Sequence, residues 1–428
     1  MNIIDNIKIE NLWGEFSVNF QCDDKFNFLI GQNGTGKTTV INLIAAALTG
    51  DFERLDKTEF DRIIITFKTN IGKKKPSIEV KKTRRENIPF YDISYIFKQY
   101  SKDTNPIIFD FGAMEQERFF RGIPSRAIRD KMIRDHFLDI RERLDSFVKV
   151  TWLSVHRNEE NRLSDERKTT PAIDQKLNLL SNSLMGYFSL LASKYSDEIV
   201  NFQKNILLSI LTSEGNEDNV ITSTGTINTE KEQKALSEIF EVLGVDKKKY
   251  SLKIKKHFEK FEEAKQQLKK RDGISTKQFA TIYDTWRSHD LVQKYEELKQ
   301  TEKNIFKSKD NFLSVINELL EGRKEVFLSE RNALHFKTKN NRPISIEELS
   351  SGEKQLLIIL GEALLQEEKH VVYIADEPEL SLHISWQETL TDYISKLNPN
   401  AQILFATHSP DIVGKHSDKL IKMKDVIK

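Results

Sequence analysis

Eight residues near the start of the chain have the types and the spacing of a phosphate-binding loop. Residues 31–38 read GQNGTGKT, which matches the pattern G-x-x-x-x-G-K-[ST]. In such a loop the glycines let backbone N–H groups surround a β-phosphate, the lysine reaches the β- and γ-phosphates, and the hydroxyl that follows binds Mg²⁺. We therefore predict a nucleotide site built from Asn33, Gly34, Thr35, Gly36, Lys37, Thr38 and Thr39.

Two acids and a histidine follow apolar runs later in the chain. Asp376 ends the run HVVYIAD and Glu377 follows it directly, while His408 follows AQILFAT. Beside a phosphate loop, Asp376 and Thr38 would hold Mg²⁺, Glu377 would polarise the attacking water, and the histidine would contact the γ-phosphate. Solvated acids at a strand end, and a structural histidine, are the alternatives; the upstream loop favours the catalytic interpretation.

A second stretch also has the character of an anion site. Residues 348–357 read ELSSGEKQLL, so two serines and a glycine directly precede an apolar, helix-like run. Small residues leave the backbone N–H groups of a helix start approachable, and the helix dipole favours negative charge there. We expect Ser350, Ser351, Gly352 and Glu353 to contact nucleotide as well.

The elements that must position these residues form an α/β pattern. Alternating or continuous apolar runs predict strands, and the run after residue 36 changes to helical periodicity. The predicted strands are 7–12, 16–20, 26–30, 63–69, 77–85, 148–155, 324–329, 333–338, 370–376 and 401–410.

The middle of the chain is polar and helix-like. Two apolar stripes, one starting at Ile254 and one at Leu291, predict a helical hairpin with a turn at residues 271–273, and residues 213–233 resemble a loop. Residues 251–310 hold 15 basic and 10 acidic residues, a local charge of +5. The predicted domains are 1–159, 160–323 and 324–428, the second being an insertion into the first and third.

Composition limits the class of protein. The 428 residues carry 66 basic and 65 acidic side chains, a net charge of +1, so the chain as a whole has no basic footprint for nucleic acid. Cys22 is the single cysteine, which excludes an internal disulfide and fits a reducing compartment. The N-terminus lacks the apolar core of a signal peptide, and the longest apolar runs are too short to cross a bilayer. We expect a cytoplasmic protein without a membrane partner.

The ordered motifs GQNGTGKTT, LSSGEKQ, VVYIADEPELSLH and ATHSP resemble the ABC-type ATPases of the SMC-like branch. The resemblance implies an α/β P-loop NTPase head with an N-terminal antiparallel β layer and a mainly α-helical insertion. It implies the Walker A, signature, Walker B with D-loop, and switch-histidine motifs, with ATP and Mg²⁺ as cofactors. Two heads would bind head to tail, as a pair or within a higher oligomer, with Ser350, Ser351 and Gly352 of one completing the ATP site of the other.

Within that branch, DEPELSLHISWQETLTDYI and NPNAQILFATHSPDIV look most like ATPases of bacterial anti-phage systems. These are the ATPase subunits of Septu (PtuA-like) and PARIS (AriA-like), and the ATPase part of OLD nucleases. About twenty residues follow His408, so we expect no TOPRIM domain. The implied protein is an ATP-hydrolysing scaffold and sensor that controls a separate HNH or TOPRIM nuclease, triggered by a nucleic acid or a phage protein.

Other functions stay open at this level. An ATPase of the RecF or SMC-like kind that acts directly on DNA is the main alternative, and the +5 helical region would serve it. A transporter ATPase and a non-hydrolysing scaffold are less well supported, since the motif DEPELSLH and Glu377 argue against them. The family's Q-loop glutamine has no clear counterpart; Gln116 and the pair His156–Arg157 are the candidates.

Overall fold

The computed structural model describes residues 2–69, 75–84, 91–100, 103–110, 138–153, 172–211, 220, 227–269 and 275–428. It divides into two compact units. Unit 1 comprises Met1–Met185 and Asn311–Lys428, and unit 2 comprises Gly186–Asp310. The unit boundaries fall inside two long helices, and the domain boundaries expected from the sequence stay predictions.

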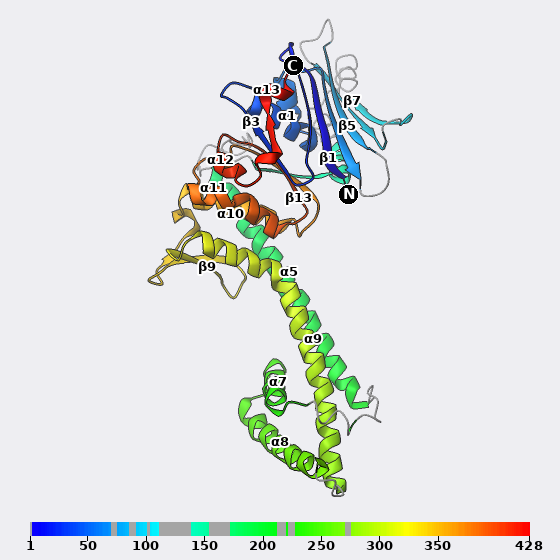
Figure 1. Cartoon of the computed structure of the whole chain (residues 1–428), viewed down its shortest axis with the longest axis vertical. Coiled ribbons are helices and arrows are strands. Elements are labelled where there is room, and N and C mark those ends of the chain that lie inside the picture. The colour runs from blue at the N-terminus through cyan, green and yellow to red at the C-terminus, as the bar shows by residue number, and fades with distance from the viewer. Residues whose placement is uncertain are drawn as a thin grey trace, which may run out of the picture. The chain divides into compact units, whose positions relative to one another are not determined.

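A six-stranded antiparallel sheet forms one layer of unit 1 (Figure 1). Strands such as the first alternate buried and half-buried side chains, with Ile7 and Ile9 buried, which is the pattern of a sheet with one face on the core. Their order is β2 (Phe16–Gln21), β1 (Asn2–Leu12), β4 (Arg62–Thr69), β5 (Ser77–Arg84), β6 (Tyr91–Lys98) and β7 (Ile107–Asp110).

A five-stranded parallel sheet forms the second layer. The two central strands are buried along almost their whole length, as the continuous apolar runs predict. The order is β14 (Leu420–Lys422), β3 (Phe26–Ile30), β13 (Ala401–Ala406), β12 (Val371–Asp376) and β8 (Lys149–Leu153). All these strands are parallel, so their carboxyl ends meet at one edge.

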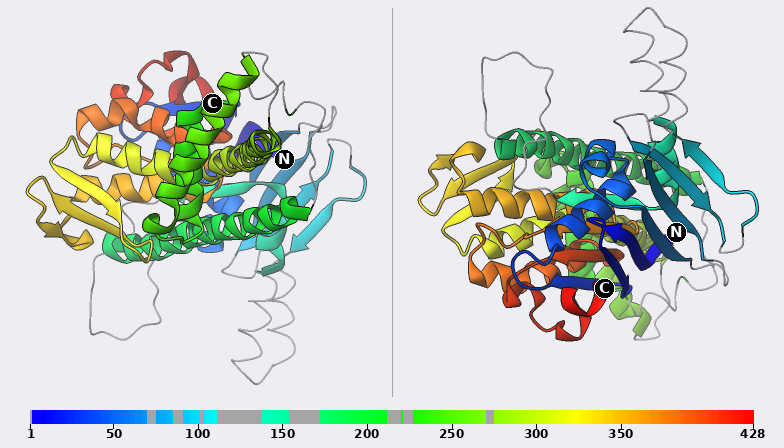
Figure 2. Two further views of the ribbon diagram at one scale, coloured as in Figure 1. Left: turned by 90° about the horizontal axis from the view of Figure 1, so that it is seen from below. Right: turned by 90° about the horizontal axis from the view of Figure 1, so that it is seen from above.

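Helix α1 (Lys37–Thr49) lies between the two sheets (Figures 1 and 2). Every residue from Leu43 to Leu48 is apolar and buried, as expected of a helix enclosed on both sides. One core cluster joins its Ile44 to Ile65 of the antiparallel sheet and to Ile374 of the parallel sheet. The side chain of Gln402 ties the sheets together further, since it accepts a hydrogen bond from Ile4 N–H and donates one to Ile4 C=O, both 2.8 Å long.

The C-terminal part of unit 1 completes the fold. Helix α10 (Ser351–Leu365) packs against α11 (Ile384–Leu397), which contacts β13. A small three-stranded sheet precedes them: β9 (Lys324–Leu328), β10 (Leu334–Thr338) and β11 (Pro343–Ile344). Short helices are α2 (Phe52–Lys57), α12 (Pro410–Val413) and α13 (Met423–Val426), with 3₁₀ turns at Ile346–Glu348 and Ser417–Lys419. The α/β class with an antiparallel layer and a helical insertion is therefore confirmed.

Unit 2 is helical, and two of its helices continue into unit 1. They are α5 (Ala172–Leu211) and α9 (Thr276–Leu319); the others are α7 (Thr229–Val242) and α8 (Lys247–Lys269). The two apolar stripes are confirmed, since Phe258, Phe261 and Tyr295 are buried, while the predicted turn at 271–273 lies outside the described residues. Most of the expected loop at 213–233 lies outside the described residues, and its end is wrong, because Asn228 caps a helix that starts at Thr229. None of the helices described is both long and apolar enough to cross a membrane.

Candidate nucleotide and catalytic site

The predicted phosphate loop joins the carboxyl end of β3 to the N-terminus of α1. Gly34 and Gly36 have φ angles of 80° and 87°, in the left-handed region that favours glycine. The Lys37 ammonium lies inside the loop, where Nζ donates to the carbonyls of Gly31 at 2.9 Å and Gln32 at 3.1 Å. The loop therefore wraps around the Lys37 ammonium, with Asn33 exposed and Thr35 and Thr39 half-buried.

Acidic side chains surround the Lys37 ammonium. Lys37 is only 5% exposed. Burial lowers the pKa of Lys37, and the carboxylates nearby, that of Glu377 above all, offset part of this effect. A buried cation held among acids suits a site for a polyanion that arrives with a metal ion.

Thr38 and Asp376 meet across the parallel sheet. The Thr38 hydroxyl donates to Asp376 Oδ1 at 3.2 Å, although β13 lies between β12, which ends at Asp376, and β3, which leads to the phosphate loop. Two hard oxygen donors at this position fit Mg²⁺, which commonly takes one or two protein oxygens and completes its shell with phosphates and waters. In the part of the chain that is described, no cluster of three or more His, Cys, Asp or Glu could hold a metal by protein ligands alone.

Glu377 and His408 face each other beside this oxygen pair. Glu377 has a φ angle of 49°, rare for a non-glycine residue, and its N–H donates to Ala406 C=O at 2.8 Å. This backbone bond fixes the turn after β12 to the end of β13. His408 Nε2 lies 3.8 Å from Glu377 Oε1, and about a third of each side chain is exposed. The structure thus brings the predicted water-polarising acid and the predicted phosphate-contacting histidine together.

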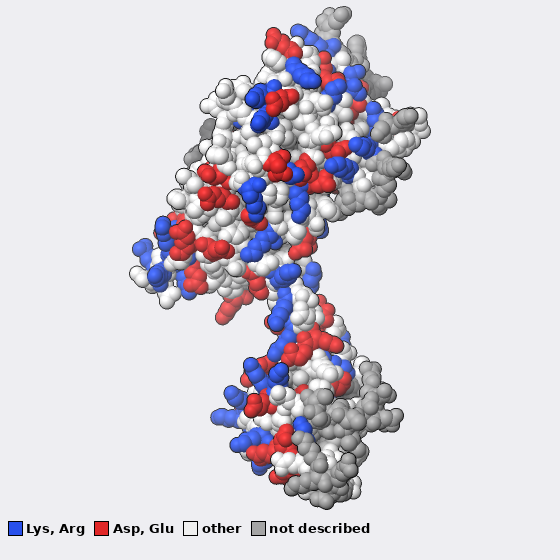
Figure 3. Space-filling model, in the orientation of Figure 1, with Lys and Arg blue, Asp and Glu red and all other residues white. Residues whose placement is uncertain are grey.

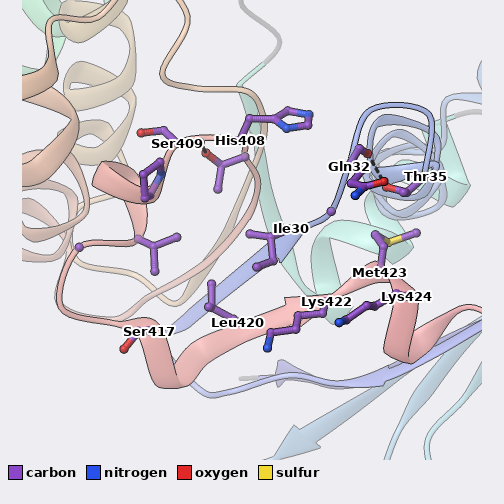
Figure 4. Close-up of a pocket in the computed structure, with 15 residues that line it drawn as sticks. Ile30, Gln32, Thr35, His408, Ser409, Ser417, Leu420, Lys422, Met423 and Lys424 are labelled. Carbon is purple, nitrogen blue, oxygen red and sulfur yellow. Dashed lines mark hydrogen bonds between the residues drawn. The ribbon is translucent and has the colours of Figure 1, made fainter.

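A pocket of about 740 Å³ opens between the phosphate loop and the His408 loop (Figure 4). Gln32 and Thr35 line one side, His408 and Ser409 the other, and Ile30 lies between them. Two lysines of the β14–α13 segment, Lys422 and Lys424, also line it. The pocket thus reaches His408 and the outer residues of the loop, while Lys37, Thr38, Asp376 and Glu377 are not part of its lining.

The second predicted anion site is a capped helix start. The Ser350 hydroxyl accepts from Glu353 N–H, and the Glu353 carboxylate accepts from Ser350 N–H, which forms a capping box. Burial would raise the pKa of Glu353, but hydrogen bonds from Lys324 and Ser350 outweigh it and the pKa falls. Glu353 therefore has intramolecular partners of its own, while Ser350 and Ser351 are exposed.

The D-loop segment after Glu377 packs against this same helix. A Cβ on Gly352 would lie 2.4 Å from the carbonyl oxygen of Ser381, so only glycine fits there. Gln355 donates to Pro378 C=O at 2.8 Å in a buried position. In the described residues, no hydrogen bond or ion pair joins Ser350, Ser351 or Gly352 to the phosphate loop.

Two residues near the site were missed by the sequence analysis. Trp13 occupies the turn between β1 and β2 with φ 57°, and its ring lies so close to Gly36 that a Cβ there would be 2.6 Å away. Its side chain is 40% exposed, which is high for tryptophan next to a phosphate loop. Glu379 is the other: its Oε1 accepts from Thr407 Oγ1, His408 N and Ser409 N. The repeated acid in DEPE was the available signal for Glu379; Trp13 had none.

The two Q-loop candidates, Gln116 and the pair His156–Arg157, lie outside the described residues.

Two retron ATPases resemble short segments of this chain in sequence. A retron Vc95 probable ATPase of Vibrio cholerae serotype O1 biovar El Tor is 33% identical over 96 residues, which cover 20% of this chain and 19% of that protein. A retron Ec83 probable ATPase of Escherichia coli is 32% identical over 85 residues, 17% of this chain and 16% of that one. The matched segments thus span less than a fifth of these relatives.

Solved structures of Smc head domains also resemble it. One from Pyrococcus furiosus, bound to the C-terminal domain of ScpA, has a TM-score of 0.44 at 15% identity, covering 99% of this chain and 93% of that one. One from Pyrococcus yayanosii has a TM-score of 0.41 at 15% identity, covering 99% and 95%. The model of the AAA ATPase domain family matches residues 1–413, almost the whole chain. The chain therefore belongs to the AAA ATPase domain family.

Proposed function

We propose that the protein hydrolyses ATP in a site shared by two copies of the chain. The observation that carries the proposal is the meeting of Lys37, Thr38, Asp376, Glu377 and His408 at the carboxyl edge of one parallel sheet. Gly34 and Lys37 bind the phosphates, and Thr38 and Asp376 hold Mg²⁺. The metal supplies charge stabilisation of the phosphates when it is bound.

The hydrolytic step follows from the positions of the two side chains at the edge. Glu377 accepts a proton from a water molecule whose oxygen attacks the γ-phosphorus, and the bond to the β–γ bridging oxygen breaks to leave ADP and phosphate. His408 contacts the γ-phosphate, where its imidazole stabilises negative charge. The 3.8 Å separation lets one water molecule or phosphate oxygen touch both groups. The expected turnover is slow and regulatory.

The second copy supplies the helix N-terminus of α10. Ser350 and Ser351 are exposed, and Ser350 caps a helix of 15 residues whose dipole favours a phosphate. In the proposal, Ser350, Ser351 and Gly352 of one copy close over ATP bound at Lys37 of the other. ATP then joins two heads, head to tail, and hydrolysis releases them. A higher oligomer built from such pairs is compatible with the same contact.

We further propose that this ATPase serves a cytoplasmic anti-phage defence complex and controls a separate nuclease of HNH or TOPRIM type. The matches to two retron probable ATPases support a defence role. A nucleic acid or a phage protein would act as the trigger. Co-purification from the native host tests this: we expect a nuclease to accompany the tagged chain, and its loss in a Ser351→Arg variant. A membrane permease in its place would overturn the defence assignment.

A second candidate function, direct binding of duplex nucleic acid, is favoured by a line of lysines on α8. Lys249, Lys253, Lys256 and Lys260 follow the i, i+4, i+7, i+11 spacing of one helix face, and all are exposed. They span about 16 Å at 1.5 Å per residue. Figure 3 shows basic side chains along α8 on the face in view.

These four lysines differ from other cations of unit 2. Lys294 and Lys299 form ion pairs with Asp290 and Glu238, whereas no ion pair within the described residues involves the four. The apolar face of α8 is buried in unit 2, which leaves too little free apolar surface for membrane insertion. Regularly spaced, unpaired lysines without aromatic neighbours on their face fit a duplex backbone better than stacked single-stranded bases.

The salt dependence of binding tests this candidate. Four phosphate contacts predict a slope of about −3.6 in a plot of log K against log salt, so the Kd for a DNA duplex rises about 150-fold from 50 to 200 mM salt. The variant Lys253→Gln with Lys256→Gln should halve the slope. The matched control is Lys303→Gln with Lys307→Gln, which removes two exposed lysines of α9. Equal effects of the two pairs, or tighter binding to anionic vesicles than to DNA, would contradict the candidate.

A further inference from the structure

We propose that Glu379 is a positioning residue for ATP hydrolysis, which holds the His408 loop so that the imidazole stays beside Glu377. The inference rests on the proposed function of His408 and Glu377 and adds a residue to it. Glu379 does not contact the reacting atoms; it acts through the backbone of the loop that follows β13.

One carboxylate oxygen of Glu379 accepts hydrogen bonds from three consecutive residues. Glu379 Oε1 accepts from Thr407 Oγ1 at 2.7 Å, from His408 N–H at 2.8 Å and from Ser409 N–H at 3.2 Å. Bonds from N–H or O–H to a carboxylate are among the stronger protein hydrogen bonds. The residue on each side of His408 and the backbone of His408 itself are therefore bound to a single atom.

The other end of this loop is tied to the phosphate-loop strand. Thr407 N–H donates to Leu29 C=O at 3.2 Å, next to the last residue of β3. Thr407 is fully buried, so both its hydroxyl and its N–H bond are shielded from water. Glu379 and Leu29 together hold the loop from two directions, and only the imidazole of His408 is left free to reach the site.

The burial of the Glu379 carboxylate costs folding free energy. The residue is 9% exposed, and its second oxygen, Oε2, is buried with no hydrogen-bond partner in the described structure. A buried, incompletely satisfied carboxylate destabilises a fold relative to an apolar residue of similar size. The three donors on Oε1 and the nearby Lys37 ammonium offset this cost.

The His408 loop is also connected to helix α10 through the D-loop. Ser409 Oγ donates to Gln387 Oε1 at 2.6 Å, and Gln387 Nε2 donates to Leu382 C=O at 2.9 Å. The D-loop that contains Leu382 rests on α10 through the buried bond from Gln355 to Pro378. Glu379 thus lies where the His408 loop, the D-loop and the start of α10 are joined within one chain.

The test is a double-mutant cycle in single-turnover ATP hydrolysis. We expect His408→Ala to lower the rate about 100-fold, in the range found for loss of one charge-stabilising group. Glu379→Ala should lower the rate at least tenfold, with the Kd for ATP changed less than about threefold. The double variant should be no slower than His408→Ala within about twofold, because Glu379 acts through His408.

Two milder variants keep the test valid if Glu379→Ala does not fold. Glu379→Gln keeps an acceptor oxygen and should retain the rate within about threefold. Thr407→Val removes one donor with little change of volume, and should lower the rate severalfold without adding to His408→Ala.

The outcomes separate this inference from the proposed function. Multiplied effects in either double variant, or a Glu379→Gln rate as low as that of Glu379→Ala, would overturn the positioning role while leaving the role of His408 in place. A His408→Ala variant with full activity would instead overturn the proposed role of His408, and the inference with it.

Discussion

The Thr38 hydroxyl donates a hydrogen bond to Asp376 Oδ1 at 3.2 Å, across 338 positions of sequence. The bond joins the first turn of α1 to the last residue of β12 and marks where Mg²⁺ would be held. It exists because β3 and β12 are parallel strands on either side of β13, so that the residues after each strand meet at one edge.

Loss of the Lys37 ammonium should abolish ATP binding. In Lys37→Ala, the positive charge next to the β- and γ-phosphates is removed, and we expect the Kd for ATP to rise at least 100-fold by isothermal titration. Lys25→Ala, which changes an exposed lysine just before β3, is the control and should bind like the original chain. Retained ATPase activity in Lys37→Ala would contradict the site assignment.

The Trp13 ring should stack on the adenine base. The ring is exposed and touches the loop at Gly36, and stacking of a base on an aromatic ring contributes about 1–3 kcal/mol. Trp13→Ala should raise the Kd for ATP about tenfold and Trp13→Phe much less. Inorganic triphosphate has no base, so its Kd should be equal in all three proteins; a parallel loss of triphosphate affinity would mean that Trp13 supports the loop instead.

Much of this fold could be predicted from the sequence, and the reasons differ by element. The strands predicted at 63–69 and 370–376 are confirmed. They could be predicted because alternating apolar residues, or a continuous apolar run, indicate which residues of a strand are buried. Helix α10 begins at Ser351 because Ser350 and Glu353 form a capping box, which is a local sequence motif.

What escaped prediction depends on contacts between distant segments. Strand β14 has three residues and is stable only because it pairs with β3. The end of the expected 213–233 loop is helical, since α7 packs on α8 within unit 2. The roles of Trp13 and Glu379 arise from neighbours 23 and 28 positions away, and no local pattern reports such proximity.

The Gln402 side chain should matter strongly for the stability of unit 1. It is 1% exposed and satisfies both backbone groups of Ile4, so Gln402→Leu leaves a buried N–H and a buried C=O without partners. We expect a loss of about 3 kcal/mol in the free energy of unfolding. Urea unfolding measures it, with the exposed Gln21→Leu as a control that should change by less than about 0.5 kcal/mol. A loss for Gln402→Leu no larger than the control's would contradict the bridging role.

Unit 2 should lose stability as the pH rises. His289 Nδ1 lies 2.6 Å from the buried carboxylate of Glu232, and this hydrogen bond raises the pKa of His289 above 6.5. The pair of protonated His289 and the Glu232 carboxylate stabilises the fold fully below pH 6.5. Its contribution is lost as the pH rises through the raised pKa of His289. Hydrogen exchange of α7 between pH 6 and 8 should show this, corrected for the intrinsic rate.

The His289→Gln variant is the control for that experiment. Its side chain keeps a donor for Glu232 but does not titrate, so the pH dependence of α7 protection should be much weaker. An unchanged dependence would assign the effect to other groups.

The central claim is that ATP joins two copies of the chain, and Glu377→Gln tests it most directly. The variant keeps the phosphate loop but loses the base, so ATP should stay bound. Light scattering in ATP and Mg²⁺ should then give a mass larger by at least one chain of 49.8 kDa than in ADP. Adding Ser351→Arg should cancel the increase while ATP remains bound. An identical mass in ATP and ADP, with ATP bound, would contradict the account.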